Sequence, residues 1–145
     1  MKQFLRLSEP VGLALHAMAL LAGKEDQWRS VRRLAEALQV SEHHLAKVMW
    51  RLKNTGLVES VMGPRGGYLL AKAAKQISLL DIYRATEGGF QAHDCLLKKR
   101  VCAGKKCILG DYMEVANNQF RDYLDRTKLS DLKDFNKSCK FFREE

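Results

Sequence analysis

The chain has 145 residues, enough for one domain or a small domain with an arm, and its apolar fraction of 46% indicates a folded protein. No apolar run approaches the ~20 residues of a membrane span and no secretion-signal pattern is present, so we expect a cytoplasmic protein without membrane association, whose thiols stay reduced. The net charge of +8 is concentrated in residues 1–80, where 12 Lys/Arg accompany 6 Asp/Glu, and this favours a phosphate-bearing partner.

The first predicted helix runs from Phe4 to Ala22, with Ser8 as a candidate N-cap and Pro10 in a position that a first turn tolerates. Residues 11–22 are almost wholly apolar and rich in small side chains, so we expect this helix to be buried between its neighbours. His16 stands alone among aliphatic residues. Its spacing favours a histidine in the core or at its boundary that is hydrogen-bonded to backbone.

Two shorter helices are predicted next, at 31–38 and from Ser41 to about Asn54, joined by a turn at 39–40. Ser30 and Ser41 can each accept an unpaired backbone N–H of a first turn. In the second of these helices the core positions are Leu45, Val48, Met49 and Leu52, and the long polar or aromatic positions are His43, His44, Lys47, Trp50, Arg51 and Lys53. The pair predicts a helix-turn-helix, although an ordinary amphipathic hairpin would share its periodicity.

Residues 57–61 and 68–70 are short, β-prone runs on either side of the turn Gly63-Pro64-Arg65-Gly66-Gly67. A helix followed by a hairpin with a basic tip is typical of a winged helix-turn-helix. The helix then enters the major groove of DNA, and the wing lies along the phosphates or the minor groove.

After a helix at 79–86, which Ser78 can cap, the chain changes character. Cys95, Cys102 and Cys107 fall in a C-x6-C-x4-C spacing, with five Lys/Arg and no acid between them. Nearby cations favour the thiolate, which binds soft metals and iron–sulfur clusters. Zinc is less natural here because structural zinc sites use tighter cysteine pairs, and three unpaired structural cysteines are the simpler alternative. Cys139 lies apart and receives no role.

A long amphipathic helix is predicted from Ile108 to Leu124, and its apolar stripe favours a two-fold dimer, although a stripe that only packs on the core would look the same. Residues 130–135 can add one more turn, and 136–145 read as a loose polar tail. The sequence therefore predicts a mainly α fold with a small β-wing. Its parts are a winged helix-turn-helix domain (1–88), a cysteine-rich sensor loop (89–107), a dimerisation helix with a short terminal helix (108–135) and the tail.

These segments carry a resemblance that extends from the first helix to about Phe135. The segments LALHAMALLA, VSEHHLAKVMWRLKNTGLVESVMGPRGGYLLAK and ISLLDIYRATEG, with the loop CLLKKRVCAGKKC, resemble the Rrf-two family of bacterial transcription regulators. The family includes members that sense iron–sulfur status or nitric oxide. The resemblance implies a winged-helix homodimer with crossed C-terminal helices that binds an imperfect palindrome in double-stranded promoter DNA.

The resemblance also implies site residues. By position, the candidate base readers are His43, His44 and Lys47, whereas Ser30 and Arg51 lie nearer phosphates and Arg65 and Gly66 form the wing tip. Cys95, Cys102 and Cys107 of one subunit would hold an iron–sulfur cluster near the first helix of the other. His16 matches a histidine ligand of some members, Glu9 is the alternative fourth ligand, and the choice between [2Fe-2S] and [4Fe-4S] stays open.

Three alternatives belong to other classes. A regulator of the same fold could switch by thiol–disulfide chemistry without a cluster. A protein–protein adaptor could keep the winged helix but would lack steep salt dependence of DNA binding. A thiol enzyme is disfavoured because only His93 and Asp94 beside Cys95 hint at a catalytic arrangement, so we expect no enzymatic activity.

Overall fold

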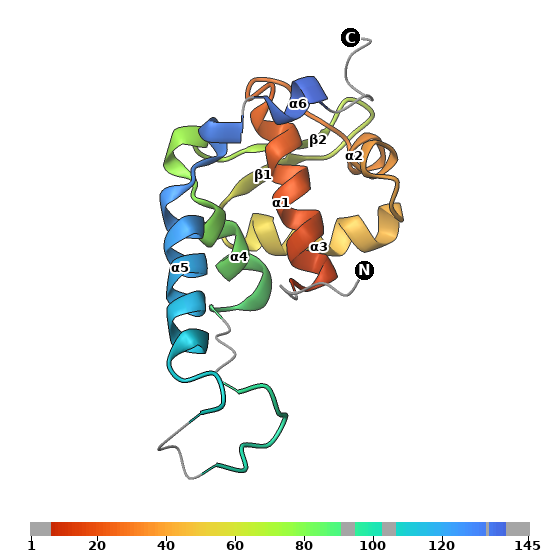
Figure 1. Ribbon diagram of the computed structural model, residues 1–145. Helices are drawn as coiled ribbons and strands as arrows, with labels where there is room; N and C mark the ends of the chain where they lie inside the picture. Colours follow the sequence, from red (N-terminus) through yellow and green to blue (C-terminus); the bar gives the residue numbers. More distant parts are fainter. Residues whose placement is uncertain (1–6, 91–94, 103–106, 133, 139–145) are drawn as a thin grey trace.

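The computed structural model describes residues 7–90, 95–102, 107–132 and 134–138 (Figure 1). The mainly α fold with a small β-wing is confirmed. In chain order the described elements are α1 (Glu9–Ala22), α2 (Val31–Leu38), α3 (Glu42–Asn54), β1 (Val58–Val61), β2 (Gly67–Leu70), the 3-10 turn η1 (Ala74–Gln76), α4 (Leu79–Glu87), α5 (Tyr112–Arg126), the 3-10 turn η2 (Leu129–Leu132) and α6 (Phe135–Ser138).

Two predicted helix starts are wrong. Helix α1 begins at Glu9, not at Phe4, because Ser8 takes an extended conformation and its hydroxyl accepts the backbone N–H of Val11 at 3.4 Å. Positions 4–6 lie outside the described residues. Helix α5 begins at Tyr112, not at Ile108, because Gly110 takes a left-handed conformation (φ 60°) in a turn closed by its own N–H on the Cys107 carbonyl at 3.0 Å.

The C-terminal predictions also need correction. The turn of helix predicted at 130–135 is two pieces, the 3-10 turn η2 and the short helix α6. Because α6 includes residues 136–138, the predicted loose tail does not begin at Asn136. Positions 139–145, including Cys139, lie outside the described residues.

Residues 7–90, together with η2 and α6, form the body of the molecule, and helix α1 lies at its centre. In the view of Figure 1, α2 lies on one side of α1, α4 lies on the other, and α3 crosses behind it. It contacts α2, α3, α4, α6, β2 and η2. Its small side chains, such as Ala14 and Ala17, allow these neighbours to approach closely, and the four predicted core positions of α3 are all buried. Each fully buried Leu or Met contributes roughly 2 kcal/mol of transfer free energy, so this packing fixes where α3 lies.

The wing is a two-stranded antiparallel sheet in which Val58 pairs with Leu70 and Val61 with Gly67. A third segment extends it, because Arg29 and Tyr68 exchange two backbone hydrogen bonds, at 3.0 and 2.8 Å. Arg29 immediately precedes Ser30, the N-cap residue of α2. The wing is therefore joined through backbone to the start of the helix-turn-helix.

Two consecutive glycines make this junction possible. A Cβ on Gly67 (φ 150°) would lie 2.3 Å from the carbonyl oxygen of Arg29, and a Cβ on Gly66 would lie 2.1 Å from the carbonyl oxygen of Val61. Both contacts are with backbone, which cannot swing aside as a long side chain can. The two positions accept only glycine without distortion of the hairpin.

The C-terminal half of α5 is anchored to the body. Leu79 donates to the Thr127 carbonyl at 3.0 Å and Leu129 donates to the Ile77 carbonyl at 2.9 Å, so the chain after α5 pairs with the chain before α4. The capping box of Ser78 and Asp81 begins α4 at this point. No helix within the described ranges is long and apolar enough to cross a membrane.

We predict that Gly67→Ala lowers the free energy of unfolding by about 2 kcal/mol or more, because the new Cβ meets the Arg29 backbone and the residue must keep a positive φ. Urea unfolding followed by circular dichroism measures the change.

Two control variants separate these causes. Gly63 has φ 117° with no atom near its Cβ position, so Gly63→Ala reports the conformational cost alone. Gly89 has neither constraint, and Gly89→Ala should change the free energy by less than about 0.5 kcal/mol. Equal effects at Gly67 and Gly89 would contradict the proposed close approach.

Candidate nucleic-acid interface and cysteine loop

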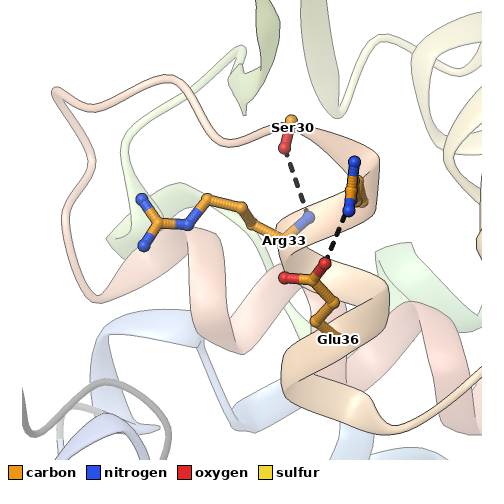
Figure 2. A network of polar contacts seen from close by, with 4 residues as sticks. Ser30, Arg33 and Glu36 are labelled. Carbon is orange, nitrogen blue, oxygen red and sulfur yellow. Dashed lines mark hydrogen bonds and ion pairs between the residues drawn. The ribbon is translucent and has the colours of Figure 1, made fainter.

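The two helices of the helix-turn-helix begin at serine caps. The Ser30 hydroxyl accepts the N–H of Arg33 at 3.2 Å, and Figure 2 shows this contact beside the ion pair between Arg32 and Glu36 at 3.1 Å. The hydroxyl of Ser41 accepts the N–H of His44 at 3.4 Å. Because each cap fixes a helix start, the positive ends of α2 and α3 have defined directions, which suits binding of phosphates.

The residues of α3 that the sequence places near DNA, as base readers or beside phosphates, separate into two groups in the structure. His43 and Lys47 are exposed and lie on the face opposite the buried Leu45 and Met49. Trp50 follows Lys47 by three residues and shares this face, with 62% of its surface exposed. These side chains are available to a molecule that approaches α3 from outside.

His44 and Arg51 lie on the flank of α3 and contact the body instead. The His44 imidazole lies 3.7 Å from the Glu9 carboxylate on α1. The Arg51 guanidinium donates to the Thr86 carbonyl at 3.1 Å, near the C-terminal end of α4. The sequence analysis missed both contacts, although the seven-residue spacing of His44 and Arg51 places them on one flank and could have revealed it.

The wing tip is exposed at Pro64, at Arg65 and at Met62, whose surface is 94% exposed. Gly66 is half-buried, and a side chain at this position would collide with the backbone of Val61. Burial raises the pKa of the Tyr68 hydroxyl on β2 above its ordinary value.

Comparisons with known proteins agree with this arrangement. Residues 7–134 match the model of the Rrf2 family, described as iron-dependent transcriptional regulators. The chain belongs to the Rrf2 family. It is a DNA-binding transcription regulator rather than an enzyme, as the sequence predicts.

Individual Rrf2-family relatives cover nearly the whole chain. An HTH-type transcriptional regulator of Aquifex aeolicus is 35% identical over 128 residues, which are 86% of this chain and 89% of the relative. The solved structure of CymR, the global cysteine regulator of B. subtilis, has a TM-score of 0.75 at 28% identity. The similarity covers 91% of this chain and 98% of the CymR chain. The structure of T. potens IscR has a TM-score of 0.72 at 28% identity, with 93% and 91% covered.

Residues 95–102, a described part of the cysteine loop, lie beyond the N-terminal end of α5 (Figure 1). Within the described part of the chain, Cys95, Cys102 and Cys107 carry free thiols, and the latter two are exposed. Lys98 and Lys99 between them are also exposed. His93, Asp94, Lys105 and Lys106 lie outside the described residues. Thiolate sulfur is the donor that iron–sulfur clusters use, so these three residues have suitable chemistry for ligands.

The described residues do not gather these donors into one site. No group of three His, Cys, Asp or Glu side chains among them lies close enough to hold a metal ion. His16 lies on α1, where it contacts the ring of Phe135 at a centroid distance of 5.6 Å.

The predicted core or boundary position of His16 is wrong, because the side chain lies on the exposed side of α1, but the predicted backbone contact is confirmed. Its Nδ1 lies 2.7 Å from the carbonyl oxygen of Gly12. Because a carbonyl oxygen only accepts, Nδ1 carries the proton, and in the neutral ring Nε2 carries the lone pair. A ring nitrogen bonded to a backbone carbonyl is the usual support of a metal-binding histidine, so His16 has suitable chemistry for a ligand.

We predict that Arg51→Ala lowers the free energy of unfolding by about 1 kcal/mol, because the Thr86 carbonyl loses its charged donor. Lys47→Ala is the matched control on the outward face of α3 and should stay within about 0.5 kcal/mol of the wild type. Thermal unfolding measures both. Equal free energies of unfolding for the two variants would contradict a stabilising role of the Arg51–Thr86 contact between α3 and α4.

Proposed function

We propose that this regulator is a homodimer whose affinity for an imperfect DNA palindrome is controlled by an iron–sulfur cluster held by Cys95, Cys102 and Cys107. The observation that carries the proposal is the set of three free thiols within thirteen residues, the last of them shortly before α5. The family description as iron-dependent regulators supports iron as the metal.

In this proposal α3 enters the major groove with His43 and Lys47 at the base edges, because these side chains are exposed and opposite the core. The capped start of α2 at Ser30 and the wing tip at Arg65 and Gly66 contact the backbone or the minor groove. His44 and Arg51 act mainly by positioning α3, since their partners belong to α1 and α4.

The proposed dimer surface is the exposed apolar part of α5 and the turn before it. Leu124 is buried and Phe120 packs on Phe90, whereas Tyr112 and Val115 remain exposed, as does Ile108 in the turn. The apolar stripe predicted on this helix thus has one part against the core and one part without cover from the described residues. A second copy of the chain would bury the latter part and place two reading helices about one duplex turn apart.

The cysteine loop leaves the body beside α4, and this position supports control of DNA binding. The C-terminal end of α4 receives the Arg51 contact from α3, and Phe90, just beyond it, packs between Tyr83 of α4 and Phe120 of α5. Movement of the loop would therefore reach α3 through a short chain of packed groups. His16 of the partner is the proposed fourth ligand, with Glu9 the alternative, and such a cluster supplies redox and ligand-exchange chemistry when bound.

We expect Cys95→Ser, Cys102→Ser and Cys107→Ser each to abolish bound iron and sulfide, because each removes a thiolate ligand. Iron and sulfide analysis with visible absorption, on protein purified without oxygen, measures the loss. Cys139→Ser is the matched control and should keep the colour. The ratio of iron to sulfide per chain, with the spectrum, then distinguishes two-iron from four-iron clusters.

The same protein tests the alternative of a cluster-free thiol switch, for which the three free thiols are also suited. A colourless wild type, even after reconstitution with iron and sulfide, would contradict the cluster. Oxidant-dependent DNA binding of that iron-free protein would then favour the disulfide switch.

An operator duplex can be selected from a random library by its binding to the wild type. We predict that Lys47→Ala weakens binding to this selected operator more than binding to a mixed-sequence duplex, because a base contact is lost. Arg65→Ala should weaken both and lower the salt slope by about one. Lys75→Ala, which removes an exposed charge from η1, is the control and should change neither. Anisotropy titrations at several salt concentrations measure these affinities. Sedimentation should show a dimer throughout, and a monomeric wild type would contradict the two-fold arrangement.

A further inference from the structure

Trp50 is a large aromatic residue on the outside of the reading helix. It lies on α3 with 62% of its surface exposed, whereas Leu45, Val48, Met49 and Leu52 of the same helix are buried. Among the described residues, Trp50 belongs neither to the core cluster nor to the apolar groups that pack against it. Packing in the body therefore does not account for an indole at this position.

The position of Trp50 relative to the proposed base readers is specific. His43, Lys47 and Trp50 follow one another at intervals of four and three residues, which places them in one row along the helix. At 1.5 Å per residue the row is about 10 Å long, close to the ~12 Å width of the major groove. A duplex that contacts His43 and Lys47 would therefore also meet Trp50.

The chemistry of the groove determines what the indole can contact. Base edges in the major groove present hydrogen-bond donors and acceptors, and their one apolar group is the C5-methyl of thymine. Lys47 and Lys53 on the same helix make its surroundings basic, which favours a polyanion over an apolar protein partner. The wide face of an indole suits a methyl group better than it suits a polar edge.

We propose that Trp50 reads thymine, by packing its indole against a thymine methyl group beside the base pairs contacted by His43 and Lys47. This inference rests on the proposed placement of α3 in the major groove. It makes Trp50 a specificity-determining residue, because the other three bases have no methyl group at that position.

The chain provides an internal optical probe of this contact. It has two tryptophans, and Trp28 lies in the loop before α2 with 38% of its surface exposed. In the Trp28→Phe variant, Trp50 is the remaining indole. An operator duplex is first selected from a random library with the wild type, and its binding is followed by anisotropy of a dye on the DNA.

We expect the emission of Trp28→Phe to shift or be quenched in proportion to the bound duplex. The Trp50→Phe variant, which keeps Trp28, is the matched control and should show little change. Trp50 is exposed, so Trp50→Ala should keep the wild-type circular dichroism spectrum and unfolding midpoint.

Replacement of thymidine by deoxyuridine in the duplex, one position at a time, removes only the C5-methyl group and so tests the methyl contact itself. Loss of one buried methyl group should weaken wild-type binding about fourfold at one position in each half-site. The same replacement should leave the affinity of Trp50→Ala unchanged. His43→Ala should bind more weakly but keep the fourfold penalty.

An unchanged Trp50 emission while anisotropy reports full binding would overturn the inference and leave DNA binding intact. Equal deoxyuridine penalties in the wild type and Trp50→Ala would overturn it as well. If the wild type bound neither the selected duplex nor a mixed-sequence duplex at low salt, the placement of α3 would fail together with the contact.

Discussion

Burial of α1 is the constraint on which the positions of the other elements depend. Eight residues from Val11 to Leu21 are buried, and α3, the wing strand β2 and α4 all pack against this one helix. Because so much of its surface is removed from water, small shifts of any neighbour would open cavities or cause collisions. The outward face of α3 is therefore held in one orientation by the apolar face on its other side.

Backbone pairing extends this rigidity to the wing. The two hydrogen bonds between Arg29 and Tyr68 connect the hairpin to the residue that precedes the Ser30 cap. This close approach of Arg29 needs a residue without a side chain at Gly67, and Gly66 meets the same need inside the hairpin, against Val61. The start of α2, the helix α3 and the tip at Arg65 thus form one unit, which is what simultaneous contact with a groove and its flanking phosphates requires.

The C-terminal end of α4 is contacted from both α3 and α1. Arg51 of α3 donates to Thr86 there, and the Ser8 hydroxyl at the start of α1 donates to the carboxylate of Glu87. Phe90, at the start of the cysteine loop, packs on Tyr83 of α4 and Phe120 of α5. This junction is the route by which the proposed cysteine-loop switch would act on α3.

The sequence by itself determined the order of the elements, the core face of α3, the glycine-rich wing and the three cysteines. Each of these depends on local periodicity, turn chemistry or spacing along the chain. Only the tertiary structure decided that His44 and Arg51 contact α1 and α4, whereas His43, Lys47 and Trp50 face outward. Only the tertiary structure also decided that Arg29 pairs with the wing and that the stripe of α5 divides between Leu124 in the core and Val115 at the surface. The physical reason is that these contacts join residues distant in the chain, and a helical repeat gives the side of a helix without giving the neighbour on that side.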